Sequence, residues 1–124
     1  MTQEQKDLLL KDLCARLPYG VKVNVKGAVY DNRSCRLTDI HHGLDTYIGV
    51  PDGMQYHIET IKPYLFPLSS MTEEQIKEWN ILAPHFAFTL ESIKIFAFYH
   101  QNHIDYNGLI EKGLAIDATG LNIY

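Results

Sequence analysis

The segment 62–72, KPYLFPLSSMT, separates two parts of the chain that have different hydrophobic patterns. Before it, apolar and polar residues alternate as in short strands, and after it apolar residues recur at helical spacing. Pro63 and Pro67 stop either pattern from continuing, because proline lacks a backbone N–H and has a fixed φ. The segment therefore predicts a rigid connector whose apolar residues lie against a core.

Residues 1–17 have the pattern of an amphipathic helix. Thr2 and Gln5 have the spacing of a capping box, in which each side chain bonds the backbone amide of the other residue. Apolar residues then recur every three or four positions until Pro18, which disfavours a helical residue before it. The residues expected on the buried face are Leu9, Leu10, Leu13, Cys14 and Leu17.

Residues 19–61 form a strand-rich part. The stretch 21–25 alternates β-branched with polar residues, as a half-buried strand does. Further short strands are expected at 28–30, 35–40, 45–50 and 55–61, separated by turn residues at 31–34, 41–43 and 51–53. Short strands joined by tight turns favour a small bent antiparallel sheet, or an SH3-like barrel in which closure removes the unpaired edges.

Residues 73–116 form a helical part after the connector. Thr72 and Gln75 repeat the capping box, and the helix that follows ends near residue 83. A third helix has Ile93, Phe96, Ala97 and His100 in one apolar stripe. Ile95, Phe98 and Tyr99 widen this stripe, so the helix is expected to be the most buried. Residues 109–113 indicate one helical turn closed by a glycine, and 114–116 a final edge strand. The predicted fold is α+β in a single domain, 1–124: an N-terminal helix, a small sheet or barrel, and two C-terminal helices packed on it.

The composition is ordinary for a soluble protein, but the charge is unevenly distributed. The formal net charge is −4. Residues 1–36 carry seven Lys or Arg and four Asp or Glu, a net +3, whereas residues 37–124 carry four and eleven, a net −7. No apolar run approaches the ~18 residues that span a bilayer, and Cys14 and Cys35 lack the CxxC spacing of a redox or metal pair. We expect a cytoplasmic protein without a membrane partner, its thiols reduced and mostly buried.

The basic N-terminal half suggests one candidate surface. Small barrels bind nucleic acid by combining basic side chains with stacking aromatic residues on a sheet face. The residues that fit this description are Lys22, Lys26, Arg33 and Arg36 with Tyr19 and Tyr30. The overall acidity argues against a dedicated nucleic-acid binder. The eight tyrosines and five phenylalanines are equally compatible with a protein interface, and the charge split with self-association.

Catalytic and metal sites have little support in the sequence. His100 and His103 would share one helical face, but a zinc site needs a third or fourth ligand from elsewhere. Ser69 and Ser70 suit a connector, and neither a G-x-S-x-G elbow nor a phosphate-binding glycine loop is present. We expect no cofactor, no metal and no enzymatic activity.

Four segments resemble a set of small uncharacterised proteins from Bacteroidales genomes and their phages or mobile elements. These segments are LLLKDLCARLPYGVKV (8–23), KPYL (62–65), PLSSMT (67–72) and DYNGLIEKGLA (105–115). The resemblance covers about a third of the chain and implies no activity, because none is assigned to that family. Our hypothesis is a non-enzymatic binding or accessory protein of phage or mobile-element origin that acts through protein–protein contact. The alternative is a small nucleic-acid-binding barrel.

Overall fold

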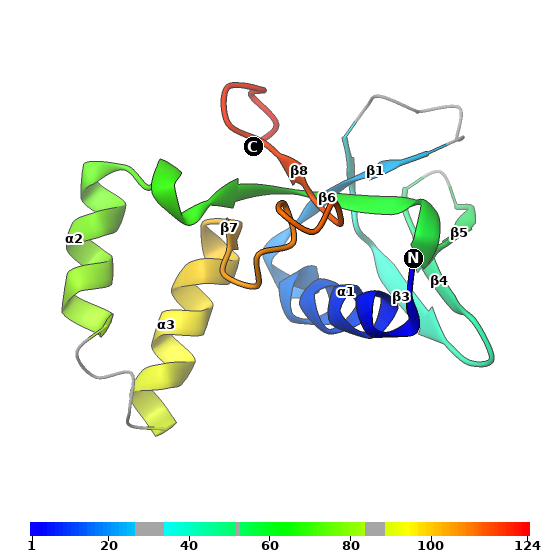
Figure 1. The fold of residues 1–124 in the computed structure, drawn as a ribbon, viewed down its shortest axis with the longest axis horizontal. Coiled ribbons are helices and arrows are strands. Elements are labelled where there is room, and N and C mark those ends of the chain that lie inside the picture. The colour runs from blue at the N-terminus through cyan, green and yellow to red at the C-terminus, as the bar shows by residue number, and fades with distance from the viewer. Residues whose placement is uncertain (27–33, 52, 84–88) are drawn as a thin grey trace.

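The computed structural model describes residues 1–26, 34–51, 53–83 and 89–124, and of 89–91 only the backbone. Figure 1 shows a sheet with a helix, α1, along one side and two further helices, α2 and α3, together at one end of the molecule. The fold is α+β, as predicted. The expected strand at 28–30 lies outside the described residues.

The first helix, α1 (Gln3–Arg16), begins with the predicted capping box. The Thr2 hydroxyl accepts a hydrogen bond from the Gln5 amide, and the Gln5 side chain accepts one from the Thr2 amide. The predicted buried face is confirmed at Leu9 and Leu13, and Leu10 and Leu17 are partly buried against the core, but the face also contains the charged pair Asp12 and Arg16. Cys14 lies outside this face and is exposed, so its predicted burial is wrong.

The larger sheet has the order β2–β1–β6–β7. Its strands β1 (Lys22–Val25), β2 (Cys35–Arg36) and β6 (Ile61–Pro67) pair in antiparallel fashion. Two further strands, β7 (Ile104–Asp105) and β8 (Ile116–Asp117), pair with β6 in parallel. A 3₁₀ turn, η1 (Leu17–Tyr19), links α1 to β1.

The segment predicted to be a connector contains the central strand of this sheet. Pro63 is tolerated in β6 because its nitrogen faces away from β1. On the β1 side, the carbonyls of Thr60 and Tyr64 accept hydrogen bonds, so alternation places residue 63 on the opposite edge. On that edge β8 pairs only with Tyr64 and Leu65. Pro67 is the last residue of the strand, where a missing donor costs little. A short 3₁₀ turn, η3 (Leu68–Ser70), then leads to the second helix.

The remaining described strands form a second sheet instead of closing a barrel with the first. This sheet has the order β3–β4–β5, with β3 (Asp39–His42), β4 (Thr46–Gly49) and β5 (Gln55–His57). The predicted strand 55–61 is interrupted by a 3₁₀ turn, η2 (Ile58–Thr60), which directs the chain out of β5 and into β6 of the other sheet. His41 and His42, expected in a turn, continue β3.

The two C-terminal helices are α2 (Glu73–Leu82) and α3 (Thr89–Gln101). The predicted capping box of Thr72 and Gln75 is present at the start of α2. The predicted apolar face of α3 is confirmed at Ile95, Phe98 and His100, which are buried, but it is wrong at Ile93 and Phe96, which are exposed. The helix is apolar on nearly all sides, so its pattern does not define the face that contacts β7 and α1.

The hydrophobic core lies between α1 and the inner face of the larger sheet. It combines Leu9 and Leu13 of α1 with the inward-facing residues of β1 and β6, and with Leu109 and Leu114 from the segment between β7 and β8. Ile48 of β4 and Ile58 of η2 extend the same core toward the second sheet. That segment is a turn in which Gly113 has a φ of 73°, as expected for a glycine that ends a helical turn. In the part of the chain that the structure describes, no helix has the length and apolarity to span a membrane.

Candidate functional site

Three of the predicted basic residues lie together on the outer face of the larger sheet. Lys22 of β1 is directly opposite Arg36 of β2. Lys26 follows the end of β1 and, by strand alternation, projects to the same side as Lys22. The inner face of the same strand carries the fully buried valines of the core. Arg33 and Tyr30 lie outside the described residues.

The structure adds Lys62 to this group, a residue that the sequence placed in the connector. Lys62 of β6 is the direct partner of Asn24, the residue between Lys22 and Lys26 on the outer side of β1. Lys26, Arg36 and Lys62 are all exposed. We use the name basic face for the outer side of β2–β1–β6 that carries Lys22, Lys26, Arg36 and Lys62.

The aromatic residues beside the basic face are not the predicted ones. Tyr19 packs against His100, with ring centroids 5.6 Å apart, near α3 and not on the outer face. Alternation along β6 places Phe66 on the same side as Lys62. The ring of Tyr124 lies beside Phe66 at 5.9 Å and is 5.8 Å from the Lys22 ammonium. The basic face is therefore bordered at one end by two partly exposed aromatic rings.

Tyr124 also joins the strands at the place where β1 and β6 separate. Its hydroxyl accepts a hydrogen bond from the Lys22 amide at 2.9 Å and donates one to the Tyr64 carbonyl at 2.7 Å. The Lys22 ammonium donates to the carbonyl of Ile123 at 2.8 Å. Burial raises the pKa of the Tyr124 phenol to about 12, so the hydroxyl keeps its proton and acts as a donor at neutral pH.

A polar cluster lies between α1, α3 and the residues after β7, and it is formed by the buried Asp12, Arg16 and His100 and the partly buried Tyr106 and Asn107. The guanidinium of Arg16 donates to Asp12 at 2.7 Å and to the carbonyl of Ile104 at 2.6 Å. It also lies 5.3 Å from the centre of the Tyr106 ring. Asn107 donates to the second carboxylate oxygen of Asp12 at 3.0 Å.

This cluster joins two of the segments that resemble the uncharacterised family, 8–23 and 105–115. Asp12 and Arg16 are fully enclosed, and their partners come from the far end of the chain. A buried charge needs such partners, because an unpaired one is costly. The geometry therefore assigns these residues to holding α1 against the 104–107 segment, with their charged groups out of the reach of solvent.

His100 and His103, which were considered above as metal ligands and not adopted, have separate environments. His100 Nε2 is 2.7 Å from the Tyr106 hydroxyl, and burial followed by the Arg16 charge lowers its pKa. His103 stacks on the Tyr124 ring, and burial lowers its pKa to about 4. Across the described residues, no three His, Cys, Asp or Glu side chains are grouped as a metal site.

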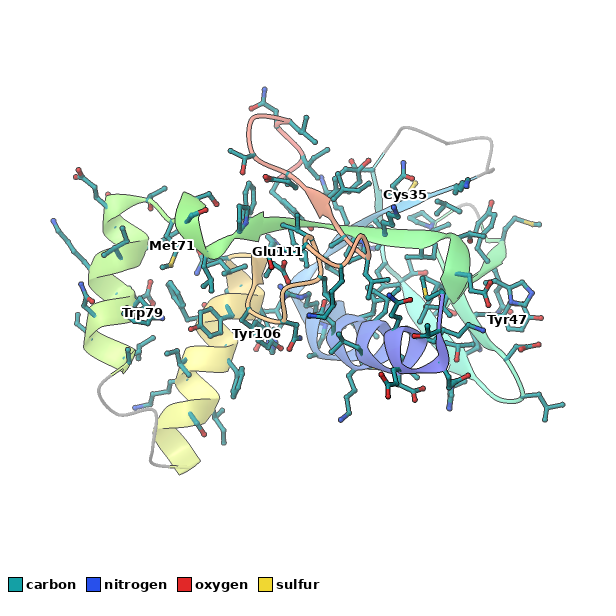
Figure 2. All side chains as sticks on the ribbon, viewed as in Figure 1. Cys35, Tyr47, Met71, Trp79, Tyr106 and Glu111 are labelled. Atoms are coloured by element: carbon teal, nitrogen blue, oxygen red, sulfur yellow. The ribbon has the colours of Figure 1, made fainter. Side chains whose placement is uncertain are left out.

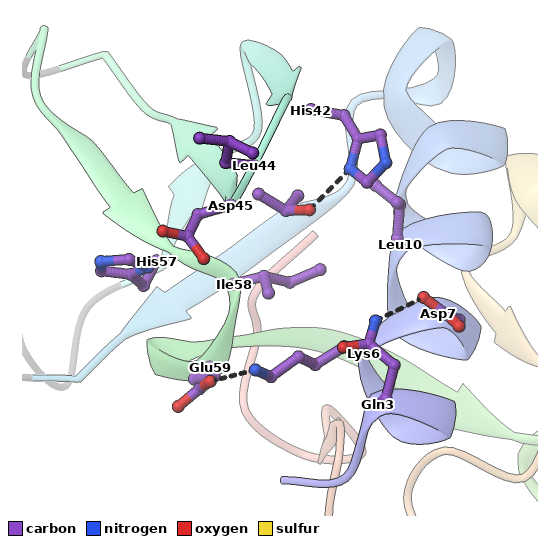
Figure 3. Close-up of a pocket in the computed structure, with 11 residues that line it drawn as sticks. Gln3, Lys6, Asp7, Leu10, His42, Leu44, Asp45, His57, Ile58 and Glu59 are labelled. Atoms are coloured by element: carbon purple, nitrogen blue, oxygen red, sulfur yellow. Dashed lines mark hydrogen bonds and ion pairs between the residues drawn. The ribbon is translucent and has the colours of Figure 1, made fainter.

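A small hollow between α1 and the second sheet contains several charged groups (Figure 3). Lys6 and Glu59 face each other across it and form an ion pair of 2.5 Å, which lowers the pKa of Glu59 and raises that of Lys6. His42 bonds the Thr46 hydroxyl at its rim. The hollow measures about 80 Å³, whereas pockets for small-molecule ligands are ~300–1,000 Å³. It is too small for a metabolite, its Lys6 and Glu59 already pair with each other, and Asp7 accepts a hydrogen bond from the Gln3 side-chain amide.

A larger hollow of about 380 Å³ lies between residues 67–69 and 105–111. Leu68, Tyr106 and Ile110 give it an apolar lining. Its one buried carboxylate, Asp105, accepts hydrogen bonds from the amides of Leu109 and Ile110 at 2.8 and 2.9 Å. The acid thus orders the turn after β7, and its oxygens are occupied by backbone donors.

The helical hairpin of α2 and α3 leaves large apolar side chains exposed. No residue of α2 is buried, and Ile81 is 70% and Ile93 is 61% exposed. The two helices are joined by a hydrogen bond from the Trp79 indole to the Tyr99 hydroxyl at 3.0 Å. Figure 2 shows Trp79 on the side of α2 that faces α3. On the other sides of the hairpin, Ile76, Ile81 and Ile93 are exposed.

Comparison with known proteins does not add to this geometry: no family model, curated protein or solved structure matches the chain. The two surfaces that stand out are the basic face and the α2–α3 hairpin. The sequence indicated three residues of the basic face, but it did not indicate Lys62 or the rings of Phe66 and Tyr124 that border the face. The strict alternation of 21–25 indicated which residues of β1 face outward. That Lys62 lies beside them depends on the pairing of β6 with β1, which no local pattern indicates.

Proposed function

We propose that this protein is a non-enzymatic binding protein that acts through protein–protein contact, and that the α2–α3 hairpin is its docking surface. The observation that carries the proposal is a two-helix element in which α2 contributes no buried residue and Ile76, Ile81, Ile93 and Phe96 are exposed. Monomeric proteins rarely leave large apolar patches exposed, and such patches mark interaction sites. Four large exposed apolar side chains on one two-helix element therefore support an interaction site. The resemblance to phage and mobile-element proteins supports an accessory role in the cytoplasm.

The charges on the hairpin indicate the chemistry of the partner. Glu73, Glu74 and Glu78 are exposed on α2. The exposed cations of the two helices are Lys77 on α2 and Lys94 on α3, so the described exposed side chains have a small acidic excess, concentrated on α2. Interfaces combine an apolar centre with a polar rim of complementary charge. The partner that fits is a protein with an apolar surface rimmed by Lys and Arg.

The acids and bases in the interior support a role other than catalysis. Asp12 is paired with Arg16, and Asp105 caps the turn that follows β7. General acid–base catalysis needs a titratable group within reach of a substrate. These groups are instead held by protein partners and have a structural use.

The experiment is capture of partners with the full chain and with Ile81→Glu and Ile93→Glu variants. Both positions are exposed, so a charge there leaves the fold intact. Leu44→Glu is the matched control, because Leu44 is fully exposed at the turn between β3 and β4, on another part of the molecule. A protein that is bound by the original chain and by Leu44→Glu, but lost with both hairpin variants, supports the proposal.

Equal capture by all four proteins, or a purified chain that converts a substrate, contradicts it. Sedimentation of the purified chain identifies the case of self-association. If the original chain is a dimer and both hairpin variants are monomers, the partner on the hairpin is a second copy. If it is a monomer throughout, the partner is a different protein.

A further inference from the structure

We propose that the basic face binds single-stranded nucleic acid, with phosphates on Lys22, Lys26, Arg36 and Lys62 and a base on the aromatic rings at its edge. This goes beyond the proposed protein contact and uses a different surface. The hairpin is formed by residues 73–101, whereas the basic face is formed by β1, β2 and β6.

The first observation is the opposition of like charges across neighbouring strands. Lys22 and Arg36 are direct partners in the antiparallel register of β1 and β2. Two cations in that position repel each other and destabilise the sheet. Lys62 adds a further positive charge one strand away, on β6. A bound polyanion turns this repulsion into attraction.

The second observation is that no carboxylate of the described residues forms an ion pair with these cations. Within the described ranges, the ion pairs are Lys6 with Glu59, Arg16 with Asp12, and His41 with Asp39. None of them involves Lys26, Arg36 or Lys62. The chain has more acids than bases, so a cluster of cations that has no ion pair with any described acid is not explained by its average composition.

The third observation is the shape and chemistry of the face. Lys22 and Lys26 are separated by about 13 Å at ~3.3 Å per residue, and the three strands span about 10 Å at ~4.8 Å per strand. A strand of nucleic acid can lie along a surface of this size. The rings of Phe66 and Tyr124 beside Lys22 provide apolar faces for stacking. Sheet faces that combine cations with aromatic rings are typical of single-strand binding.

Two other anionic partners fit less well. A duplex is read by an element that enters a groove, and this surface is a sheet face without a projecting helix or ribbon among the described elements. Peripheral membrane binding needs apolar side chains that insert among lipids, but the exposed outward residues of β1 and β2 are polar. Both partners are included as outcomes of the test.

The test is fluorescence anisotropy of a labelled single-stranded oligonucleotide with the full chain over a range of salt concentrations. Neutralising four phosphates predicts that log Kd rises with log salt with a slope of about 3. The triple variant Lys26→Glu, Arg36→Glu and Lys62→Glu is expected to weaken binding at least about tenfold. All three side chains are exposed, and a thermal melt checks that the variant is folded.

The matched control reverses three cations elsewhere: Lys11→Glu on α1, Lys77→Glu on α2 and Lys112→Glu in the turn before β8. It changes the net charge of the protein by the same amount as the first variant. Oligonucleotide affinity within about twofold of the original chain is expected, after the general effect of net charge has been screened by salt. The Ile81→Glu and Ile93→Glu hairpin variants also keep this binding, so either proposal can fail without the other.

Three results overturn the inference. One is no oligonucleotide binding at low salt, and another is equal weakening by both triple variants. The third is equal or tighter binding of polyglutamate, a duplex of the same length or vesicles with anionic lipid, which defines a general polyanion surface. Loss of oligonucleotide binding with the basic-face variant alone, together with preference for the single strand, confirms it.

Discussion

The ring of Tyr124 lies flat on the imidazole of His103, with ring centroids 3.7 Å apart and planes inclined by 10°. The two residues thereby connect β7 to β1 and β6. The carbonyl of His103 accepts a hydrogen bond from the Phe66 amide, and the Tyr124 hydroxyl bridges Lys22 and Tyr64. His103 has a φ of 56°, which is uncommon for a residue other than glycine. Between Lys22 of β1 and Tyr64 of β6, the Tyr124 hydroxyl therefore takes the place of a direct backbone hydrogen bond.

The hydroxyl of Tyr124 is expected to stabilise this junction. Tyr124→Phe keeps the stacked ring but removes the bridge, leaving the Lys22 amide and the Tyr64 carbonyl without it. We expect the free energy of unfolding to fall by about 1 kcal/mol, measured by urea denaturation at neutral pH. Tyr19→Phe is the control, because Tyr19 contacts His100 through its ring. A loss of the same size in both variants would show that the bridge has no special role.

The same pair predicts a decline in stability in mild acid. In the unfolded chain His103 binds a proton near its ordinary pKa of 6.5, whereas in the fold burial lowers this pKa to about 4. Between these values the unfolded state binds more protons, so the free energy of unfolding decreases as the pH falls. Above pH 6.5 both states are neutral at this residue and its contribution is constant. Below pH 4 both states are protonated and the loss from this residue reaches its limit.

The test compares the original chain with His103→Asn over this pH range. Asparagine tolerates the positive φ but does not titrate. The variant is expected to be less stable at neutral pH, because the stacking is lost, and to lose less stability on acidification. Urea midpoints measured from about pH 7 to pH 4 report the difference. Parallel curves for the two proteins would mean that His103 titrates alike in both states.

Local patterns in the sequence predicted the parts of the fold that depend on local interactions. Both capping boxes are made by residues three positions apart, and the alternation of 21–25 is set by the two faces of a single strand. The α+β class followed from these patterns. They do not contain the pairing between strands, which determines that the two sheets remain separate.

The central position of β6 illustrates what local patterns miss. Two prolines in seven residues argue against a central strand, but the cost of Pro63 depends on which edge of β6 needs its N–H. That is decided by β1 and β8, which are distant in sequence. Lys62 was omitted from the candidate site for the same reason. Tyr124 gave no local signal, because its role arises from contacts with His103 and Lys22.

The buried pair of Asp12 and Arg16 gives a prediction about stability. Asp12→Ala leaves a fully buried guanidinium without its counter-charge and removes the acceptor of Asn107. The expected loss in the free energy of unfolding is about 3–5 kcal/mol, a large part of the ~5–15 kcal/mol typical of a small domain. If this variant does not fold, Asp12→Asn, which keeps an acceptor without the charge, is expected to fold with a smaller loss.

The control for this prediction is the ion pair of Lys6 and Glu59 on the same helix. Its side chains are 32% and 52% exposed, so water screens the charges. Glu59→Ala is expected to cost no more than about 1 kcal/mol. Chemical denaturation of the variants gives both values. Equal losses at the two pairs would refute the assignment of Asp12 and Arg16 as the partners that hold α1 in place.

Gly49 of β4 gives the last prediction, because the side chain of its cross-strand partner occupies the space of a Cβ atom. A methyl group at this position would overlap the carboxylate of Asp39. Asp39 bonds the hydroxyl of Thr38 and the ring of His41, and the Thr38 bond is the main cause of its lowered pKa. Gly49→Ala therefore displaces a half-exposed side chain that can move, and we expect the free energy of unfolding to fall by about 1 kcal/mol.

In an Asp39→Ala background the overlap is absent, so the same Gly49→Ala substitution is expected to cost little. The two substitutions are thus non-additive in a double-mutant cycle measured by thermal unfolding. Additive effects would show that the cost of Gly49→Ala does not come from the space that Asp39 takes.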